Sequence, residues 1–256
     1  MKRYHGYLID LDGTIYRGNK VIEFATQFID TIHAKGIPYL FVTNNSSKTP
    51  EVVAQQLQNM GIKATPEHVL TSSSATATYI RQEREYARCY VIGEEGLFHA
   101  LEEEGIEITD ENCDYVIMGL DRQITYEKLA KASTAIRNGA KLISTNADDA
   151  IPSEHGLLPG NGALTSVITR STGVDPVFIG KPEPIMMHEA LYILGTDKRD
   201  TIMVGDNYAT DIQAGFNMGI DTLMVFTGVT SPKDLRTIDR PPTYHINHLA
   251  EWIHNI

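Results

Sequence analysis

Cysteine is scarce in this chain, which has 256 residues and only two cysteines, Cys89 and Cys113. Two cysteines exclude both a disulfide-stapled scaffold and a cysteine-rich zinc site. Neither is followed six positions later by arginine, because Glu95 and Gly119 stand there. This excludes the loop of a cysteine-dependent phosphatase, and we expect both cysteines to be packing residues.

Long apolar runs and an excess of basic residues are also missing. We therefore predict no membrane-spanning segment, and the apolar stretch near the N-terminus is too short for a secretory signal. The 22 Lys and Arg residues face 33 Asp and Glu residues, which gives a formal net charge of −11. Binding to a nucleic-acid backbone needs a basic face, so we expect no nucleic-acid partner. Because neither a secretory nor a membrane-spanning segment is predicted, we expect a cytoplasmic protein with no membrane partner. An anionic substrate would need a local positive charge.

What the sequence does contain is a regular alternation of short β-rich runs and helical patterns. The predicted strands are 7–9, 39–42, 90–92, 115–117, 142–143, 201–204 and 222–226, and the predicted helices are 21–35, 50–61, 97–104, 129–137, 184–194, 210–218 and 248–256. This alternation is typical of βαβ units with mostly parallel sheets. The strands are too numerous for one sheet, so we predict two α/β domains, with ligands beyond the carboxyl ends of strands.

The first predicted strand ends in two aspartates, Asp10 and Asp12, followed by Gly13 and Thr14. Side chains alternate along an extended chain, so the two carboxylates fall on one side. Carboxylates that close repel each other unless a cation or a proton intervenes. Asp-Gly between apolar runs is equally typical of a two-residue hairpin turn, so both interpretations stay open.

Three further polar clusters follow predicted strands or loops. Residues 43–46 (Thr-Asn-Asn-Ser) offer hydrogen-bond donors, although they could equally form a helix N-cap. Lys181 lies between Gly180 and a proline, a setting typical of a solvated loop. Asp206 ends a strand where nothing local needs a carboxylate, whereas Asp211 near a helix start could be only a favourable dipole contact.

In order and spacing, these clusters resemble the four motifs of the haloacid dehalogenase-like (HAD) phosphatases. The matching residues are Asp10-Leu11-Asp12-Gly13-Thr14, Thr43-Asn44, Lys181, and Gly205-Asp206 with Asp211. About 135 residues separate the second and third motifs. That placement is similar to the NagD-type branch, whose large α/β cap is inserted there. Residues 145–148 (Thr-Asn-Ala-Asp) and 156–163 also match that branch.

The resemblance implies a fold, a reaction class and a cofactor. The expected fold is α/β, with a Rossmann-like parallel-sheet core formed by residues 1–78 and 181–256 and an inserted α/β cap formed by residues 79–180. The expected activity is magnesium-dependent hydrolysis of small phosphorylated metabolites, such as sugar phosphates, acid-sugar phosphates or nucleoside monophosphates. Homodimerisation through the cap is a further family-level expectation.

The resemblance also implies roles for the acidic residues. Asp10 is the expected nucleophile, which becomes an aspartyl-phosphate, and Asp12 is the expected general acid and base. Mg²⁺ would be held by Asp10, by the backbone carbonyl of Asp12 and by Asp206, with Asp211 behind them. Lys181 has both a catalytic and a substrate-binding role, because four carboxylates and a phosphoryl group would repel one another without cations.

The expected substrate-binding residues form two groups. Thr43 and Asn44 hold phosphoryl oxygens through hydroxyl and amide donors. Asn146 and Asp148, with nearby His155, follow a predicted strand of the insert, and we expect them to recognise the leaving group of the substrate. The alternative is that Asn146 and Asp148 only shape a turn.

Two other functions use similar residues. A phosphotransferase or mutase would form the same aspartyl-phosphate but pass the phosphoryl group to a hydroxyl acceptor. A non-enzymatic phosphoaspartate receiver also has clustered acids, a threonine and a lysine on a parallel sheet. The large insert argues against a receiver, as does Asp12, which can promote turnover.

Overall fold

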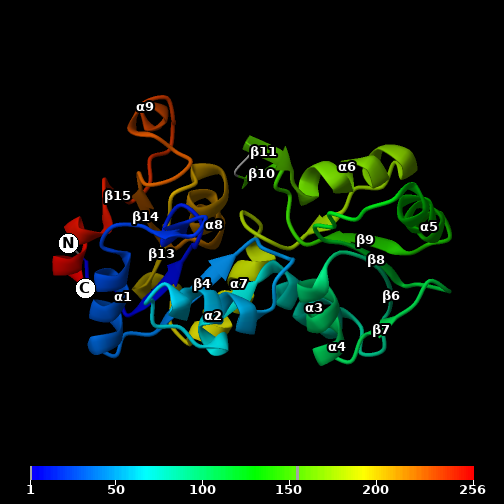
Figure 1. Cartoon of the computed structure of the whole chain (residues 1–256), viewed down its shortest axis with the longest axis horizontal. Coiled ribbons are helices and arrows are strands. Elements are labelled where there is room, and N and C mark those ends of the chain that lie inside the picture. The colour runs from blue at the N-terminus through cyan, green and yellow to red at the C-terminus, as the bar shows by residue number, and fades with distance from the viewer. Residues whose placement is uncertain (1, 154–155) are drawn as a thin grey trace. The chain divides into compact units, whose positions relative to one another are not determined.

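The computed structural model describes residues 2–153 and 156–256, which form two compact units (Figure 1). The first unit consists of residues 1–43, 50–70 and 181–256, and the second of residues 44–49 and 71–180. The boundary predicted at residue 78 falls inside helix α3 (Ser72–Glu83). The predicted core and cap roles of these units stay predictions. His155 lies outside the described residues.

The first unit is built on a six-stranded sheet in the order β15-β14-β13-β1-β4-β5. Its strands are β1 (Gly6–Ile9), β4 (Tyr39–Thr43), β5 (Val69–Thr71), β13 (Thr201–Gly205), β14 (Asp221–Val225) and β15 (Tyr244–Ile246). β1 pairs in parallel with both β13 and β4, and the ladder continues in parallel through β14 to β15. The central strands are buried along their length, as is typical of parallel sheets covered on both faces.

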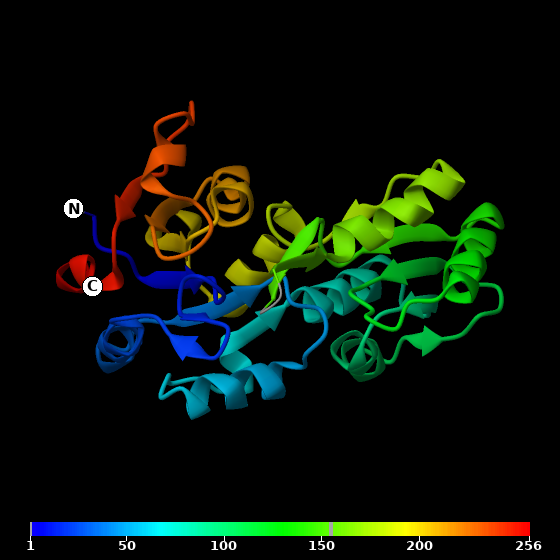
Figure 2. The same cartoon turned by 45° about the horizontal axis from the view of Figure 1, so that its top comes forward.

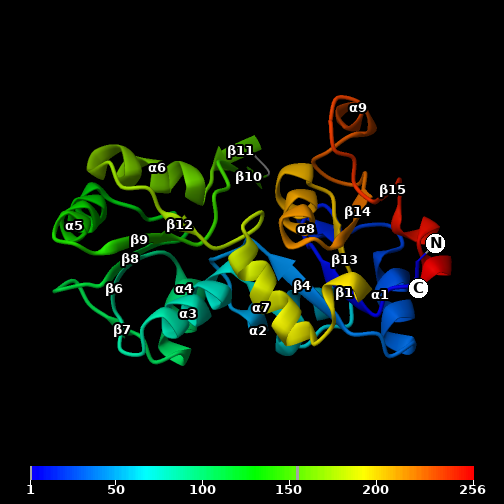
Figure 3. The same ribbon diagram turned by 180° about the vertical axis from the view of Figure 1, so that it is seen from behind.

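Helices cover both faces of this sheet because successive strand residues point to opposite sides. These helices are α1 (Ala25–Ala34), α2 (Pro50–Asn59), α7 (Pro184–Leu194) and α8 (Gln213–Met218). The four-residue helix α9 (Pro232–Leu235) has no buried residue. Tyr7 and Ile9 of β1 share one core with Phe28 of α1 and Leu57 of α2. On the other side, α7 contacts β4 and α8 contacts β13 and β14, as Figure 3 shows for α7.

The second unit has its own five-stranded sheet, in the order β12-β9-β8-β6-β7, and every pairing in it is parallel. Its strands are β6 (Arg88–Ile92), β7 (Glu107–Ile108), β8 (Tyr115–Met118), β9 (Lys141–Ser144) and β12 (Val177–Phe178). Helices α5 (Tyr126–Arg137) and α6 (Asn161–Thr172) lie on one face, and α3 and α4 (Glu95–Glu103) lie on the other (Figures 1 and 2). Separately, β10 (Ala150–Ser153) pairs antiparallel with β11 (Gly156–Pro159).

The predicted α/β class is confirmed, and the predicted elements differ from the structure mainly at their ends. Val21 belongs to a small hairpin of β2 (Tyr16–Arg17) and β3 (Lys20–Val21), so α1 starts only at Ala25. The residue before it, Phe24, has φ of 66°, a left-handed conformation that breaks the helical pattern.

Other differences are elements that were not predicted, among them helices α3 and α6 and several short helical turns. The predicted helix 248–256 is two 3₁₀ turns, η4 (Leu249–Glu251) and η5 (Ile253–Asn255). Further 3₁₀ turns are η1 (Pro66–His68) and η2 (Lys198–Asp200). Within residues 2–153 and 156–256, none of the helices combines the length and apolar character needed to cross a bilayer.

Candidate active site

The carboxyl end of β1 starts the site. The backbone N–H of Asp10 donates to the carbonyl of Val204 on β13 (2.9 Å), so the ladder still holds Asp10 in place. After it the chain turns, and the carbonyl of Leu11 accepts the N–H groups of the three residues from Thr14 to Tyr16. Because both neighbours of β1 run parallel to it, β1 is not an arm of a hairpin, and the hairpin interpretation of Asp-Gly is wrong.

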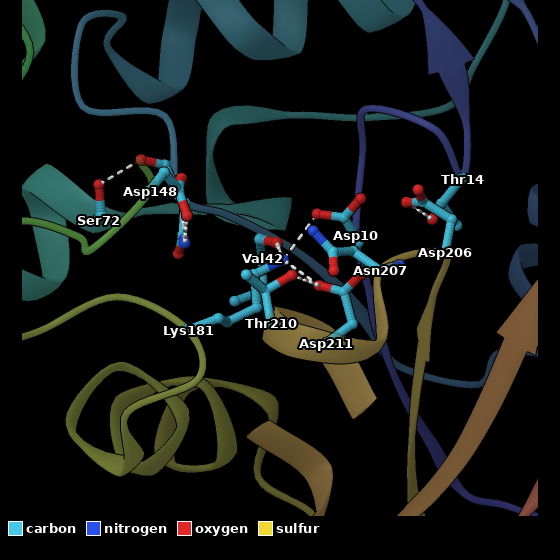
Figure 4. A network of polar contacts seen from close by, with 11 residues as sticks. Asp10, Thr14, Val42, Ser72, Asp148, Lys181, Asp206, Asn207, Thr210 and Asp211 are labelled. Carbon is cyan, nitrogen blue, oxygen red and sulfur yellow. Dashed lines mark hydrogen bonds and ion pairs between the residues drawn. The ribbon is translucent and has the colours of Figure 1, made fainter. Parts of the chain in front are cut away.

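Lys181 joins the ends of three elements. Its Nζ donates to Oδ1 of Asp10 (2.6 Å), to Oδ1 of Asp211 (2.8 Å) and to the carbonyl of Val42 on β4 (2.8 Å), as Figure 4 shows. Its side chain is only 2% exposed, so the alternative of a solvated loop lysine is wrong. Burial alone would lower the pKa of Lys181, but Asp10 and Asp211 outweigh it and raise that pKa. Lys181 is therefore a buried, charged ammonium.

Asp211 is held from its own side of the site. It lies on a π-helical turn, η3 (Tyr208–Ile212), which leads into α8. Its Oδ2 accepts the backbone N–H of Asn207 (3.0 Å), while its Oδ1 accepts from Lys181. A Cβ on Gly205 would come within 2.3 Å of the Asp211 side chain. The aspartate is thus more than a helix-dipole contact, because its carboxylate is oriented toward the ammonium of Lys181.

Asp206 sits in a close-fitting cradle at the end of β13. Oδ1 accepts the hydroxyl of Thr14 (3.1 Å), and Oδ2 accepts the backbone N–H of Val229 (2.7 Å). A Cβ on Gly13 would lie 2.4 Å from Asp206 Oδ2, and one on Gly228 only 1.8 Å from it. Two glycines and two donors therefore fix the position of a carboxylate that is fully buried.

The donor set fits a hard cation. Among the described residues, one group of potential metal ligands lies close enough together to hold an ion. It consists of Asp10, Asp206 and Asp211, each of which offers a carboxylate oxygen within 4.8 Å of the others. Burial first, and then Asp211, raises the pKa of Asp10 well above its ordinary value and the pKa of Asp206 to about 6. Three crowded carboxylates with one ammonium carry surplus negative charge, and oxygen-only ligands suit Mg²⁺. Asp12 has an exposed side chain outside this cluster.

Thr43 and Asn44 follow one another at the end of β4, which pairs with β1. Thr43 is the last, buried residue of the strand. The Nδ2 of Asn44 lies 3.1 and 3.3 Å from the two carboxylate oxygens of Asp148. Its carbonyl accepts from Oγ of Ser72 (2.8 Å) and from Nδ2 of Asn146 (2.9 Å). Asn44 is thus fixed by side-chain bonds and does not cap α2.

Sequence reasoning missed the groups that hold the acidic residues in place. Thr14 belongs to a predicted motif, but its bond to Asp206 has no local pattern that would reveal it. Gly228 leaves room for the Asp206 carboxylate because it has no side chain, and the backbone N–H of Val229 donates to that carboxylate. Neither feature can be recognised from the sequence. The carbonyl of Val42 is hidden for the same reason. The one usable signal was a glycine shortly after a predicted strand.

Matches to family models agree with this site. Residues 7–107 match the model described as haloacid dehalogenase-like hydrolase, and residues 178–252 match a second HAD-hydrolase-like model. Together they cover the end of β1, the end of β4, Lys181 and the Asp206–Asp211 segment. The chain belongs to the haloacid dehalogenase-like hydrolases, which confirms the predicted family.

Named relatives narrow the class further. The chain is 58% identical over 253 residues to 5′-nucleotidase YutF of Bacillus subtilis, with 99% of each chain covered. It is 56% identical to acid sugar phosphatase of Staphylococcus aureus, with 99% of this chain and 98% of that protein covered. A solved p-nitrophenyl phosphatase from Archaeoglobus fulgidus superposes with a TM-score of 0.95 at 32% identity, covering 100% of both chains. The predicted NagD-type branch and enzyme class, a HAD-like phosphatase, are confirmed.

Proposed function

We propose that this chain is a magnesium-dependent phosphatase that hydrolyses small phosphorylated metabolites through an aspartyl-phosphate on Asp10. The observation that carries the proposal is the buried contact of Lys181 with both Asp10 and Asp211 (2.6 and 2.8 Å) beside Asp206. It supplies a nucleophile, a fixed positive charge and a carboxylate cluster at the carboxyl ends of two neighbouring strands.

Asp10 has the first role in the reaction. Lys181 holds its Oδ1, which orients the carboxylate. An Asp10 oxygen attacks phosphorus, the bond from phosphorus to the leaving oxygen breaks, and the leaving oxygen takes a proton from Asp12. In the second step Asp12 removes a proton from water, the water oxygen attacks phosphorus, and the bond to Asp10 breaks. The exposure of Asp12 supports this role, because its carboxyl group can meet both substrate and water.

Asp10, Asp206 and the backbone carbonyl of Asp12 would hold Mg²⁺, with Asp211 beside them. When bound, the ion offsets the charge of the carboxylates and of the phosphoryl group. Asp211 fixes Lys181, while Thr14 and Val229 fix Asp206.

Thr43, Asn44 and Lys181 would bind phosphoryl oxygens. In the second unit, we propose that the half-buried Asp148 contacts the leaving group. Asn146, which is buried, belongs with Asp148 to the proposed substrate-binding residues.

The substrate class rests on what the relatives share. Their names specify a nucleotidase, an acid sugar phosphatase and a nitrophenyl phosphatase, so the leaving groups differ while the phosphoryl group is common. We propose sugar phosphates, acid-sugar phosphates and nucleoside monophosphates as the first substrates to screen. Homodimerisation through the second unit stays a prediction, which sedimentation at several concentrations would test.

Phosphate release by two matched aspartate variants tests the function. Asp10→Asn should lower kcat by ~10³-fold or more, since the loss of even one electrostatic contact costs ~10²–10³. Asp110→Asn, an exposed aspartate paired with Lys131, is the control and should be unaffected. Chelation should stop turnover and added Mg²⁺ should restore it. Activity in Asp10→Asn close to that of the unaltered chain would refute the nucleophile, and a need for a hydroxyl acceptor would indicate a phosphotransferase.

A further inference from the structure

The inference concerns the chain segment that carries Asn44, and it rests on the proposed function. Asn44 continues the chain beyond β4, and its carbonyl accepts two side-chain hydrogen bonds, one from Ser72 at the start of α3 (2.8 Å) and one from Asn146 (2.9 Å). A carbonyl oxygen has two lone pairs, so two side-chain donors saturate it and fix the orientation of that peptide. Ser72 and Asn146 come from widely separated parts of the sequence, so the bonds are tertiary.

Both ends of the Asn146 amide are engaged inside the second unit. Its Nδ2 donates to the carbonyl of Asn44 (2.9 Å) and to Oγ1 of Thr145 (3.3 Å), and its Oδ1 accepts the backbone N–H of Asp148 (3.1 Å). The residue is only 3% exposed. A side chain that recognises a leaving group has to offer an atom to the ligand, and this amide has already committed its donor and its acceptor to the protein.

Asn146 is itself held by a buried asparagine. Nδ2 of Asn161, the first residue of α6, lies 2.9 Å from the carbonyl of Asn146 and 2.9 Å from Oγ of Ser144. Asn161 is 1% exposed. A chain of amide contacts therefore runs from α6 through Asn146 to the peptide of Asn44, and a buried chain of this kind resists displacement.

Gly180 also packs against this part of the chain, because its Cα lies next to Asn44 and Asn146. A Cβ there would come within 2.6 Å of Oδ1 of Asn44, 2.7 Å of the carbonyl of Thr145 and 3.1 Å of Cβ of Asn146. The N–H of Gly180 donates to the carbonyl of Thr145 (2.8 Å), which fixes the approach. We call Ser72, Asn146 and Gly180 the Asn44 clamp.

We propose that Asn146 is a positioning residue: with the rest of the Asn44 clamp it fixes the peptide of Asn44 and thereby holds this residue where it can bind a phosphoryl group. This differs from recognition of the leaving group in one measurable respect. Every substrate carries the same phosphoryl group, so loss of the clamp should slow all substrates by one common factor. Loss of a leaving-group contact would change their ranking.

Asn146→Asp is the sharpest variant, since a carboxylate has nearly the same shape but cannot donate to the Asn44 carbonyl. We expect kcat/KM to fall by ~10-fold to ~10²-fold, as small misplacements of positioning groups do. The factor should agree within about twofold for p-nitrophenyl phosphate, a sugar phosphate and a nucleoside monophosphate, because all three lose the same interaction with the phosphoryl group. Inhibition by inorganic phosphate, which has no leaving group, should weaken as well.

Ser72→Ala removes the second donor and should give the same pattern with a smaller factor. The double variant with Asn146→Ala should be non-additive, because both side chains hold one carbonyl. Ser133→Ala is the control: it removes a buried hydroxyl in the same unit, bonded to Ser171, and should leave the kinetics unchanged. If Asn146→Asp does not fold, Asn146→Ala and Ser72→Ala carry the same test.

Two results would overturn the proposal. One is a change in substrate ranking with unaltered inhibition by phosphate, which would make Asn146 a leaving-group residue. The other is kinetics in folded Asn146 and Ser72 variants that match those of the unaltered chain. Neither depends on the proposed function, which fails separately if the unaltered chain releases no phosphate from any substrate.

Discussion

Replacement of Lys181 by methionine should destabilise the first unit strongly and in a pH-dependent way. Methionine keeps most of the volume but leaves the carboxylates of Asp10 and Asp211 without their shared ammonium. The side chain of Lys181 is 2% exposed, that of Asp10 is 14% exposed and that of Asp211 is 1% exposed. Removal of one partner from such a buried pair costs about 3–5 kcal/mol. At ~2–4 °C per kcal/mol for a chain of this size, the melting midpoint should fall by ~6–20 °C.

The loss of stability should shrink as the pH falls. Burial raises the pKa of Asp10 well above its ordinary value, and the charge of Lys181 is one of the effects that counteract this. Without Lys181 the pKa of Asp10 rises further. The cost of an ionised Asp10 is then fully present above the raised folded pKa. It shrinks as the pH falls below that value, because the folded carboxyl group is protonated there, and it is gone below the unfolded pKa.

Thermal unfolding at pH 8 and pH 5, in a chelating buffer, measures both effects. The chelator matters because a bound cation could replace part of the missing charge. Lys131→Met is the matched control, since Lys131 also pairs with an aspartate at 2.9 Å but is about half exposed (48%). Exposed pairs contribute little, so its midpoint should barely move. A Lys181→Met midpoint no lower than that of the control, or a deficit equal at both pH values, would refute the reasoning.

Three other perturbations have defined outcomes. Gly228→Ala would place a Cβ 1.8 Å from Oδ2 of Asp206, so binding of Mg²⁺ measured by calorimetry should weaken at least ~10-fold, and an unchanged affinity would contradict the cradle. Burial first, and then His33, lowers the pKa of His68, so its stabilising contribution is complete above pH ~6.5 and is lost as the pH falls. In urea unfolding, the free energy of unfolding of the unaltered chain should exceed that of His68→Gln by less at pH 5.5 than at pH 7.5. A difference that stays constant would exclude His68 as the cause of the loss of stability. Asp12→Asn should keep the fold but slow turnover by ~10²-fold or more, measured as phosphate release, because acid and base transfer contributes that much; full activity would remove Asp12 from the mechanism.

The alternation of strands and helices could be predicted because each buried strand or amphipathic helix carries its own pattern. Helix α7 (Pro184–Leu194), for instance, occupies the predicted range, where proline opens the helix and Gly195 ends it. Helices α3 and α6 escaped prediction because serine and threonine dominate both. Their low apolar content gives a weak helical period, and tertiary contacts decide their conformation.

The candidate site was predictable only where a side chain does the chemistry. Asp10, Lys181 and Asp211 are far apart in the sequence, and only the spacing of the family motifs connects them before folding. What orients the charged side chains of the site is the backbone, for example the carbonyl of Val42, and the space left by glycines such as Gly228. These leave no mark on composition or periodicity, so they emerge only with the fold.

The division of the chain has a consequence for protein engineering. The second unit includes the short segment 44–49, so the chain passes from one unit to the other four times. The hydroxyl of Ser73 donates to the carbonyl of Ser46 (2.8 Å), and the N–H of Gly96 donates to the carbonyl of Ser47 (3.1 Å). Residues 71–180 are therefore no self-contained cassette: excision would strip the hexapeptide after Thr43 of these partners. A transplant between relatives should exchange both segments together.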